Sequence, residues 1–450
     1  MSEHKEHAQE LSKEQKGFSR RQFLTKSLGV GAAAVGGSLL GIGALGEANP
    51  ALAEGAPNSQ DGEPLDIKAH KEMPVKIAND YKRFDQKNSI FGRGTLGDPD
   101  VAPHYGSFRD KTIGVIPPTE ELGFTQIDRA LERAGWAMMD YAAPRNSAGI
   151  RDNGVYSWKN FAPNPKKWKF KDPTEAATTI KHAAEFLGAD DTGITVYDER
   201  WVYGSFFNFT KKESETEDFP FKVQNVIALV YEMDYDAFKT APTLIADAAA
   251  GVGYSRMAET SHKLATFIRQ LGYNAIASGN CTALSIPIAI QAGLGEIGRN
   301  GLLINPRFGP RVRISKIFTD LPMQTDKPIT FGVREFCETC MKCALTCPSQ
   351  AITQDPKPSM SGKSISNNNG VEKWYIDPEK CTQTWGKFGG GCGSCITSCP
   401  YNKLETWHHE LAKLATKTPA RPILKQFDDL FGYGKTYNEK EIKRFWEVKK

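Results

Sequence analysis

The spacing of apolar residues predicts three amphipathic helices in the chain. Apolar side chains recur at helical intervals in residues 125–141, 174–187 and 255–271, the pattern of a helix with one buried face. The second helix has clear end signals. Asp172 offers an N-cap, Pro173 suits the first helical position, and Gly188 follows the last turn.

Short apolar runs between these helices predict strands. Residues 193–197, 226–231 and 273–277 have strand-like composition, and the run 226–231 is apolar without interruption, as in a strand buried on both faces. Because helix and strand patterns alternate, we expect a layered α/β domain over residues 172–330.

The remaining pattern divides the chain into further segments. We expect a targeting signal at 1–53, an irregular N-terminal unit at 54–171 that begins with a polar lead-in, a cysteine-rich domain at 331–405 and a C-terminal segment at 406–450. No solenoid-type repeat is visible, and only the cysteine motif is duplicated.

The N-terminal segment has the features of a twin-arginine export signal. Arg20 and Arg21 precede an uncharged stretch at 27–46, and an Ala-x-Ala sequence at 51–53 predicts cleavage there. A membrane anchor is the alternative reading of the uncharged stretch. The stretch is rich in Gly and Ala and therefore weakly hydrophobic, which favours a cleaved signal.

Composition is that of a globular protein. The 450 residues are 40% hydrophobic and 24% charged, which excludes a disordered chain and a polytopic membrane protein. The net charge is only +4 and no block of Lys and Arg occurs, so we expect no nucleic-acid partner.

Eight of the nine cysteines lie between residues 337 and 399. The first four follow the bacterial ferredoxin run C-x2-C-x2-C-x3-C-P, and the second four follow C-x10-C-x2-C-x3-C-P. In such proteins three cysteines of one run and the last cysteine of the other hold each 4Fe–4S cluster. Zinc sites use paired ligands, and disulfides have no reason to repeat this spacing. The predicted ligand sets are Cys337, Cys340, Cys343 and Cys399 for one cluster, and Cys381, Cys392, Cys395 and Cys347 for the other. The remaining cysteine, Cys281, is expected to be a small buried hydrophobe.

A glycine-rich run suggests a site for a large ligand. Gly293, Gly295 and Gly298 match G-x-G-x-x-G, but no long helix is predicted after them, so a dinucleotide site lacks its required context. The three glycines still permit close backbone approach to another cofactor. A molybdenum cofactor or a siroheme stays open. The eight histidines show no metal-ligand spacing, and the adjacent pair His408 and His409 is interpreted as surface or packing residues.

Taken together, these motifs resemble the respiratory reductive dehalogenases. The likeness covers most of the chain after the signal and is strongest from about residue 190 to 406. It is carried by Gly251-Val252-Gly253-Tyr254-Ser255-Arg256-Met257, Ala292-Gly293-Leu294-Gly295-Glu296, Phe308-Gly309-Pro310-Arg311-Val312-Arg313 and Phe331-Gly332-Val333-Arg334-Glu335-Phe336-Cys337. Tyr197-Asp198-Glu199-Arg200-Trp201 and Asn280-Cys281-Thr282 resemble the tetrachloroethene and dichloroethane enzymes most.

The resemblance implies a fold, cofactors and a site. The expected fold is α+β or α/β: a nitroreductase-like domain that binds a base-off corrinoid without a protein ligand to cobalt, joined to a ferredoxin-like domain with two 4Fe–4S clusters. Matching positions imply that Tyr254 is the proton donor, that Arg313 stabilises the phenolate left behind, and that Asn280 lines the same cavity. Gly293, Gly295 and Gly298 are the candidate corrinoid-binding residues.

The resemblance also implies a context. The expected substrate is a small organohalide, a chlorinated ethene or ethane in the first place and a halophenol in the second. The expected partners are a small integral-membrane anchor protein and a quinol-linked electron donor, on the outer face of the cytoplasmic membrane. Two alternatives stay open: an epoxyqueuosine reductase, which the export signal argues against, and an exported electron-transfer protein without substrate chemistry.

Overall fold

A computed structural model describes residues 67–113, 119–142, 154–158, 162–216, 218–404, 428 and 432–447. The predicted export signal and the pair His408 and His409 lie outside these residues. Residues 64–450 form one compact unit. No helix among the described residues has both the length and the hydropathy needed to span a bilayer.

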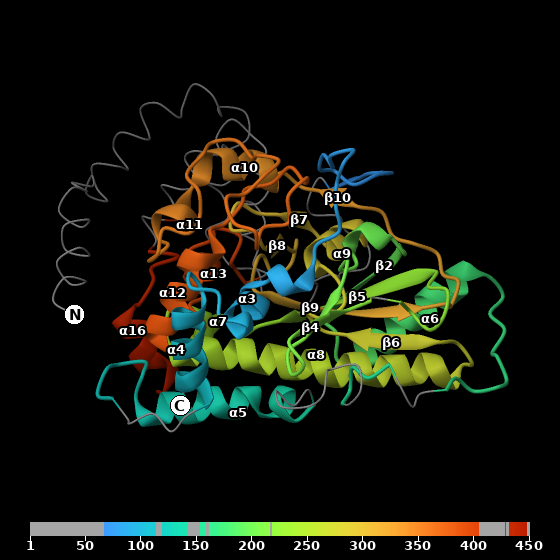
Figure 1. Cartoon of the computed structure of the whole chain (residues 1–450), viewed down its shortest axis with the longest axis horizontal. Helices are drawn as coiled ribbons and strands as arrows, with labels where there is room; N and C mark the ends of the chain where they lie inside the picture. Colours follow the sequence, from blue (N-terminus) through green and yellow to red (C-terminus); the bar gives the residue numbers. More distant parts are fainter. Residues whose placement is uncertain are drawn as a thin grey trace, which may run out of the picture. The chain divides into compact units, whose positions relative to one another are not determined.

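The centre of the unit is a four-stranded sheet with helices on both faces (Figure 1). The strands are β2 (Asp191–Val196), β5 (Asn225–Glu232), β6 (Ala275–Ser278) and β9 (Val312–Thr319), in the order β2-β5-β9-β6. Every pair is antiparallel, with Ile194 opposite Ile227 and Leu229 opposite Ser315. The layered arrangement agrees with the prediction, and the strand directions give the sheet an α+β character.

Strand β5 contributes to two hydrophobic cores because its successive side chains point to opposite faces. Ile227, Leu229 and Tyr231 pack with helices α6 (Pro173–Phe186) and α8 (Leu244–Gln270). Val226, Ala228 and Val230 pack on the other face with α9 (Ser285–Gln291). Both faces of β5 are therefore buried, as its uninterrupted apolar run predicted.

The helix α8 is longer than predicted. It begins at Leu244, capped by the Thr243 side chain, and ends before Gly272, whereas the apolar period predicted a start near Ser255. Its first half is rich in alanine and contains Gly251 and Gly253, so no amphipathic period marks it. Tyr254 consequently lies in the middle of a helix rather than at its start.

The other predicted elements agree closely with the structure. Helix α5 (Gln126–Ala142) runs beside α8, as Figure 1 shows below the sheet. Helix α6 has the predicted Asp172 cap, which accepts hydrogen bonds from the backbone N–H groups of Thr174 and Glu175.

The cysteine-rich segment consists of short helices and packs closely on the N-terminal residues. Helix α12 (Pro378–Phe388) lies against α3 (Ile90–Leu96) and α4 (Ala102–Ile113), and Arg93 forms an ion pair with Glu379. The predicted boundary at 171 stays a prediction, although contacts of this kind cross it. Within the described ranges the remaining helices are α7 (Tyr235–Phe238), α10 (Val333–Cys340), α11 (Lys342–Leu345), α13 (Ser394–Thr397) and α16 (Glu439–Phe445), with the 3-10 turns η3 (Gln86–Asn88) and η4 (Glu199–Trp201). The remaining strands are β1 (Lys68–Ala69), β3 (Phe206–Asn208), β4 (Glu213–Glu215), β7 (Glu296–Ile297), β8 (Leu303–Ile304) and β10 (Ile329–Thr330).

Candidate active site

The structure brings Tyr254, Asn280 and Arg313 together from three different elements. Tyr254 lies on α8, Asn280 on the loop after β6, and Arg313 on β9. The Asn280 amide nitrogen donates to the Tyr254 phenol oxygen at 2.7 Å, and Arg313 Nη1 donates to the same oxygen at 3.5 Å. The Arg313 guanidinium also lies 4.6 Å from the centre of the Tyr254 ring. Two donors, one of which is also a cation, therefore converge on one phenol.

Two glycines make this arrangement sterically possible. A Cβ atom at Gly253 would lie 2.8 Å from Arg313 Cγ, and a Cβ atom at Gly251 would lie 2.6 Å from the indole of Trp136. Trp136, on α5, stacks on the Tyr254 ring with centroids 4.9 Å apart and planes 26° apart. The glycines that obscured the first half of α8 in the sequence thus allow Arg313 and Trp136 to pack closely around Tyr254.

Two cavities share the wall that holds Arg313. The larger has a volume of about 510 Å³ and is lined by Asn280 and Tyr203, while the smaller has about 290 Å³ and is lined by Tyr254 and Trp136. Both linings are mostly apolar. The residues common to the two linings are Phe91, Leu302, Arg313 and Trp385. The trio therefore lies where two neighbouring ligand-sized spaces meet.

The cysteines are divided between two places. Four of them line the 290 Å³ cavity together with Tyr254, and the other four line a separate space of about 20 Å³. Asn300 lines both spaces. The group beside Tyr254 is Cys347, Cys381, Cys392 and Cys395, and the other group is Cys337, Cys340, Cys343 and Cys399. These are the two ligand sets expected from the sequence, including the exchange of the fourth cysteine between the runs.

The thiols are buried and close to one another. Burial, together with the neighbouring cysteines, raises the pKa of Cys337 and of Cys381 to about 12. A bound cluster removes this penalty because coordination deprotonates a thiol. No three His, Cys, Asp or Glu side chains among the described residues are placed to hold a single metal ion. A four-iron cluster is larger than one ion, and its thiolates surround it.

None of the glycines Gly293, Gly295 and Gly298 lines either large cavity, although Ile297 of the same run lines the larger one. Gly293 and Gly295 have positive φ angles, +77° and +148°, and a Cβ atom at Gly295 would lie 2.1 Å from the carbonyl oxygen of Ile304. The third glycine, Gly298, lines the space beside the Cys337 group. A short strand, β7, follows Gly295. A dinucleotide site would require a long helix there, so the structure agrees with the prediction that this run does not form one.

This run supports the first cysteine motif through a buried carboxylate. Glu296 accepts hydrogen bonds from the backbone N–H groups of Phe331 and Val333, at the start of α10. The N-cap residue of α10 is Gly332, which has no side chain with which to cap the helix. Because α10 carries Cys337 and Cys340, the glycine-rich run helps to hold two of the predicted cluster ligands.

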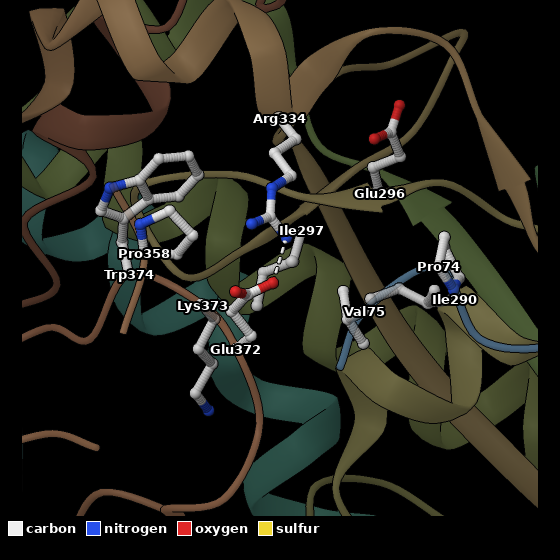
Figure 2. Close-up of a pocket in the computed structure, with 10 residues that line it drawn as sticks. All are labelled: Pro74, Val75, Ile290, Glu296, Ile297, Arg334, Pro358, Glu372, Lys373 and Trp374. Carbon is white, nitrogen blue, oxygen red and sulfur yellow. Dashed lines mark ion pairs between the residues drawn. The ribbon is translucent and has the colours of Figure 1, made fainter. Parts of the chain in front are cut away.

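An ion pair also holds the same helix. Figure 2 shows Arg334 of α10 pointing towards Glu372, and the two are 2.8 Å apart. The hydrogen bond from Arg334 keeps the pKa of Glu372 below its usual range. The space among these side chains is about 20 Å³, enough for a water molecule but not for a cofactor.

Sequence reasoning missed several residues of the site. Trp136 lay in a correctly predicted helix, but nothing in the helical pattern distinguished it from other apolar positions. Phe91 and Trp385 come from segments far apart in the sequence and meet only in the folded chain. Cys281 is buried in the main hydrophobic core, as expected for a small apolar side chain.

Comparison with known proteins identifies the family. Residues 336–403 match the 4Fe-4S dicluster domain. A tetrachloroethene reductive dehalogenase of Desulfitobacterium hafniense is 37% identical over 72% of this chain and 73% of its own length. A tetrachloroethene reductive dehalogenase of Sulfurospirillum multivorans is 32% identical over 96% of this chain and 93% of its own length. The chain belongs to the reductive dehalogenase family.

A solved structure extends the comparison to the fold of this dehalogenase. A reductive dehalogenase described as carrying out B12-dependent dehalogenation aligns with a TM-score of 0.64 and 26% identity over 85% of this chain. The alignment covers only 50% of that protein, so this dehalogenase spans about half of its length. The family fold and the dicluster domain establish the dehalogenase as an oxidoreductase whose cofactors are a corrinoid and two 4Fe–4S clusters.

The larger cavity of the dehalogenase fits a corrinoid chemically. Its lining is mostly apolar, with side chains such as Val312, Ile314 and Ile290, which suits a flat macrocycle. The lining also includes polar side chains, among them Gln86 and Asn368, which suit the amide groups at a corrinoid's periphery.

Proposed function

We propose that this protein removes halide from a small, uncharged organohalide, with a chlorinated ethene as the first candidate substrate. The two relatives compared above are tetrachloroethene reductive dehalogenases by name. The smaller cavity, which also has to hold the cluster of the Cys347 group, supports the same choice, because Phe108, Trp136, Phe238 and Ala250 make its wall apolar. Chlorinated ethanes and halophenols are the next candidates.

The reaction replaces a carbon–halogen bond by a carbon–hydrogen bond. It consumes two electrons and one proton and releases one halide ion. When bound, the corrinoid supplies low-potential cobalt for the reduction of the organohalide. The protein must deliver electrons one at a time, exclude water and provide the proton.

The convergence of two donors on the Tyr254 oxygen is the observation that carries the proposal. Tyr254 donates its proton to the reduced carbon. The Asn280 amide at 2.7 Å and the Arg313 guanidinium then stabilise the phenolate. Their geometry is already that of donors aimed at a developing negative charge, so little reorganisation is needed during proton transfer. Trp136 keeps the ring in place by stacking.

The positions of the cysteines support an order of electron transfer. The cluster held by the Cys347 group is proximal, because its four ligands line the same cavity as Tyr254. The cluster held by the Cys337 group is distal and receives electrons first. Asn300 lies between the two groups and donates to the Cys395 carbonyl oxygen at 3.4 Å.

The cellular setting of the enzyme is part of the same proposal. The twin-arginine motif at Arg20 and Arg21 supports export of the folded enzyme, and cleavage near Ala53 would release the mature chain. On the outer face of the cytoplasmic membrane, a small integral-membrane protein would anchor it and a quinol-linked donor would reduce the distal cluster.

The deciding experiment measures halide release by the purified holoenzyme under anaerobic conditions with a low-potential donor. A panel of chloroethenes, chloroethanes and halophenols should give fastest release from a chloroethene. Release from halophenols alone would overturn the substrate assignment. A protein that contains iron but no cobalt and releases no halide would instead be an electron-transfer protein.

A further inference from the structure

A fully buried lysine lies behind the loop that carries Asn280. Lys316 on β9 has no exposed surface, and it faces the residue Ser278 of β6 across the sheet. Its ammonium group donates hydrogen bonds to the carbonyl oxygen of Gly279 and to the Ser285 hydroxyl, the latter at 2.7 Å. Among the ion pairs of the described residues, none includes Lys316.

Lys316 and Tyr203 together fix the two peptide groups that flank Asn280. Lys316 holds the carbonyl oxygen of Gly279, in the peptide before Asn280. The Tyr203 hydroxyl donates to the carbonyl oxygen of Asn280, in the peptide after it, at 3.1 Å. Because peptide groups are planar, fixing both of them restricts the φ and ψ angles of Asn280 and therefore the direction of its Cβ atom.

The rest of the loop offers Asn280 little other support. The Asn280 side chain is exposed and contacts Tyr254 at its tip. Thr282, two residues later, has a positive φ of +68°, which costs a non-glycine residue conformational energy. The Ser278 hydroxyl donates to the Cys281 carbonyl oxygen at 2.8 Å, which closes the turn, and it lies 3.4 Å from the Gly279 carbonyl oxygen. Lys316 makes the shorter of the two contacts with that Gly279 oxygen.

We propose that Lys316 is a positioning residue for proton transfer: it orients the Gly279–Asn280 peptide so that the Asn280 amide points at the Tyr254 oxygen. This inference rests on the proposed role of Tyr254 as proton donor. Lys316 acts through Asn280, and its own ammonium group contacts neither large cavity.

The chemistry of the position favours such a role over packing alone. A buried cation without a carboxylate partner is costly, whereas an apolar side chain would fill the same interior space without that cost. Burial lowers the pKa of Lys316 to about 8, which reflects this cost. Both forms of the amine carry N–H donors, so the Gly279 carbonyl keeps its partner on either side of that pKa. Burial also raises the pKa of Tyr203, which therefore remains a hydroxyl donor.

A double-mutant cycle between Lys316 and Asn280 tests the inference. Lys316→Met in the holoenzyme should lower kcat for halide release by up to ~5–10-fold, the loss expected when the Asn280 donor is removed entirely. KM and the cobalt and iron contents should stay at parental values. In an Asn280→Ala background, Lys316→Met should cause no further loss of kcat, because the group that it orients is gone.

The controls separate positioning from general stability. Lys263→Met removes a lysine from the exposed face of α8 and should leave kcat unchanged. If Lys316→Met fails to yield holoenzyme, Lys316→Gln is measured in the same two backgrounds, because its amide keeps a donor and removes the charge.

Two outcomes would overturn the inference and leave the proposed function standing. An equal loss of kcat in both backgrounds would show that Lys316 acts on the fold and not through Asn280. A parental kcat in Lys316→Met, together with a reduced kcat in Asn280→Ala, would show that Asn280 is oriented without Lys316. If Tyr254→Phe and Asn280→Ala both retain parental kcat, the proposed function of Tyr254 fails first, and the inference fails with it.

Discussion

Replacing Asn280 by Ala should slow proton transfer by an amount that follows from its single contact. In the resting enzyme the amide donates to a neutral phenol at 2.7 Å, a bond worth about 0.5–1.5 kcal/mol. When Tyr254 gives up its proton the same bond is made to a phenolate, and hydrogen bonds to charged groups are worth about 1.5–3 kcal/mol. The difference, about 1 kcal/mol, acts only as charge develops. It corresponds to a fall in kcat of ~5–10-fold, since about 1.4 kcal/mol is a factor of ten.

The assay is steady-state halide release by Asn280→Ala with a low-potential donor, together with cobalt and iron analysis. The loss should appear in kcat, and it should be largest when proton transfer limits turnover, which a solvent deuterium isotope effect reports. Asn438→Ala is a suitable control, because Asn438 makes no side-chain capping bond at the start of α16 and lines neither large cavity.

Two results would refute the reasoning. A parental kcat in Asn280→Ala, at full cofactor content, would mean that the phenol oxygen does not become negative in the slow step. A loss of cobalt from Asn280→Ala would mean that the side chain holds the cofactor rather than the proton donor, because Asn280 also lines the larger cavity.

Further predictions concern the donor itself, the clusters, pH and export. Tyr254→Phe should lower turnover by ~10² or more with cofactors retained, the usual range for a positioned general acid, and near-normal halide release would rule out this role. Cys399→Ser should remove the distal cluster alone, although Cys399 belongs to the second motif, and should reduce the iron content from about eight to about four atoms per chain. Loss of the proximal cluster's signal in electron paramagnetic resonance would contradict the assignment. Burial lowers the pKa of Lys316 from 10.5 to about 8, so the unfolded chain binds more protons than the folded one between these pH values. In denaturant titrations, the free energy of unfolding of the parent relative to Lys316→Met should therefore rise by about 3 kcal/mol from pH 8 to pH 10.5. A difference that is independent of pH would contradict the shift. Replacing Arg20 and Arg21 by Lys should retain active enzyme in the cytoplasm, and continued processing near Ala53 would indicate another export route.

Local sequence patterns determined a large part of this protein. The ends of α6 follow from Asp172, Pro173 and Gly188, because capping and backbone preference act within a few residues. The burial of β5 on both faces follows from its uninterrupted apolar run. The two cysteine sets follow from spacing, since a cubane cluster needs three ligands from one tight loop and a fourth from elsewhere.

The roles of the glycines could not be read from the sequence. Gly251 and Gly253 lay outside the predicted helix, yet each provides room for a side chain from another element, Trp136 or Arg313. Gly295 looked like a site for close approach of a cofactor, and the group that approaches it is the carbonyl oxygen of Ile304. In each case the neighbour that requires a glycine is distant in the sequence.

The surroundings of Tyr254 were decided by tertiary structure alone. Resemblance to a family pointed to Tyr254, Asn280 and Arg313, but their meeting depends on α8 passing beneath β9 and on the loop after β6. Lys316 and Trp136 carry no sequence signal, because a lysine in a strand and a tryptophan in a helix are ordinary until their neighbours are known. Sequence patterns encode interactions within a few residues, whereas the chemistry of this site depends on groups brought together by the packing of whole elements.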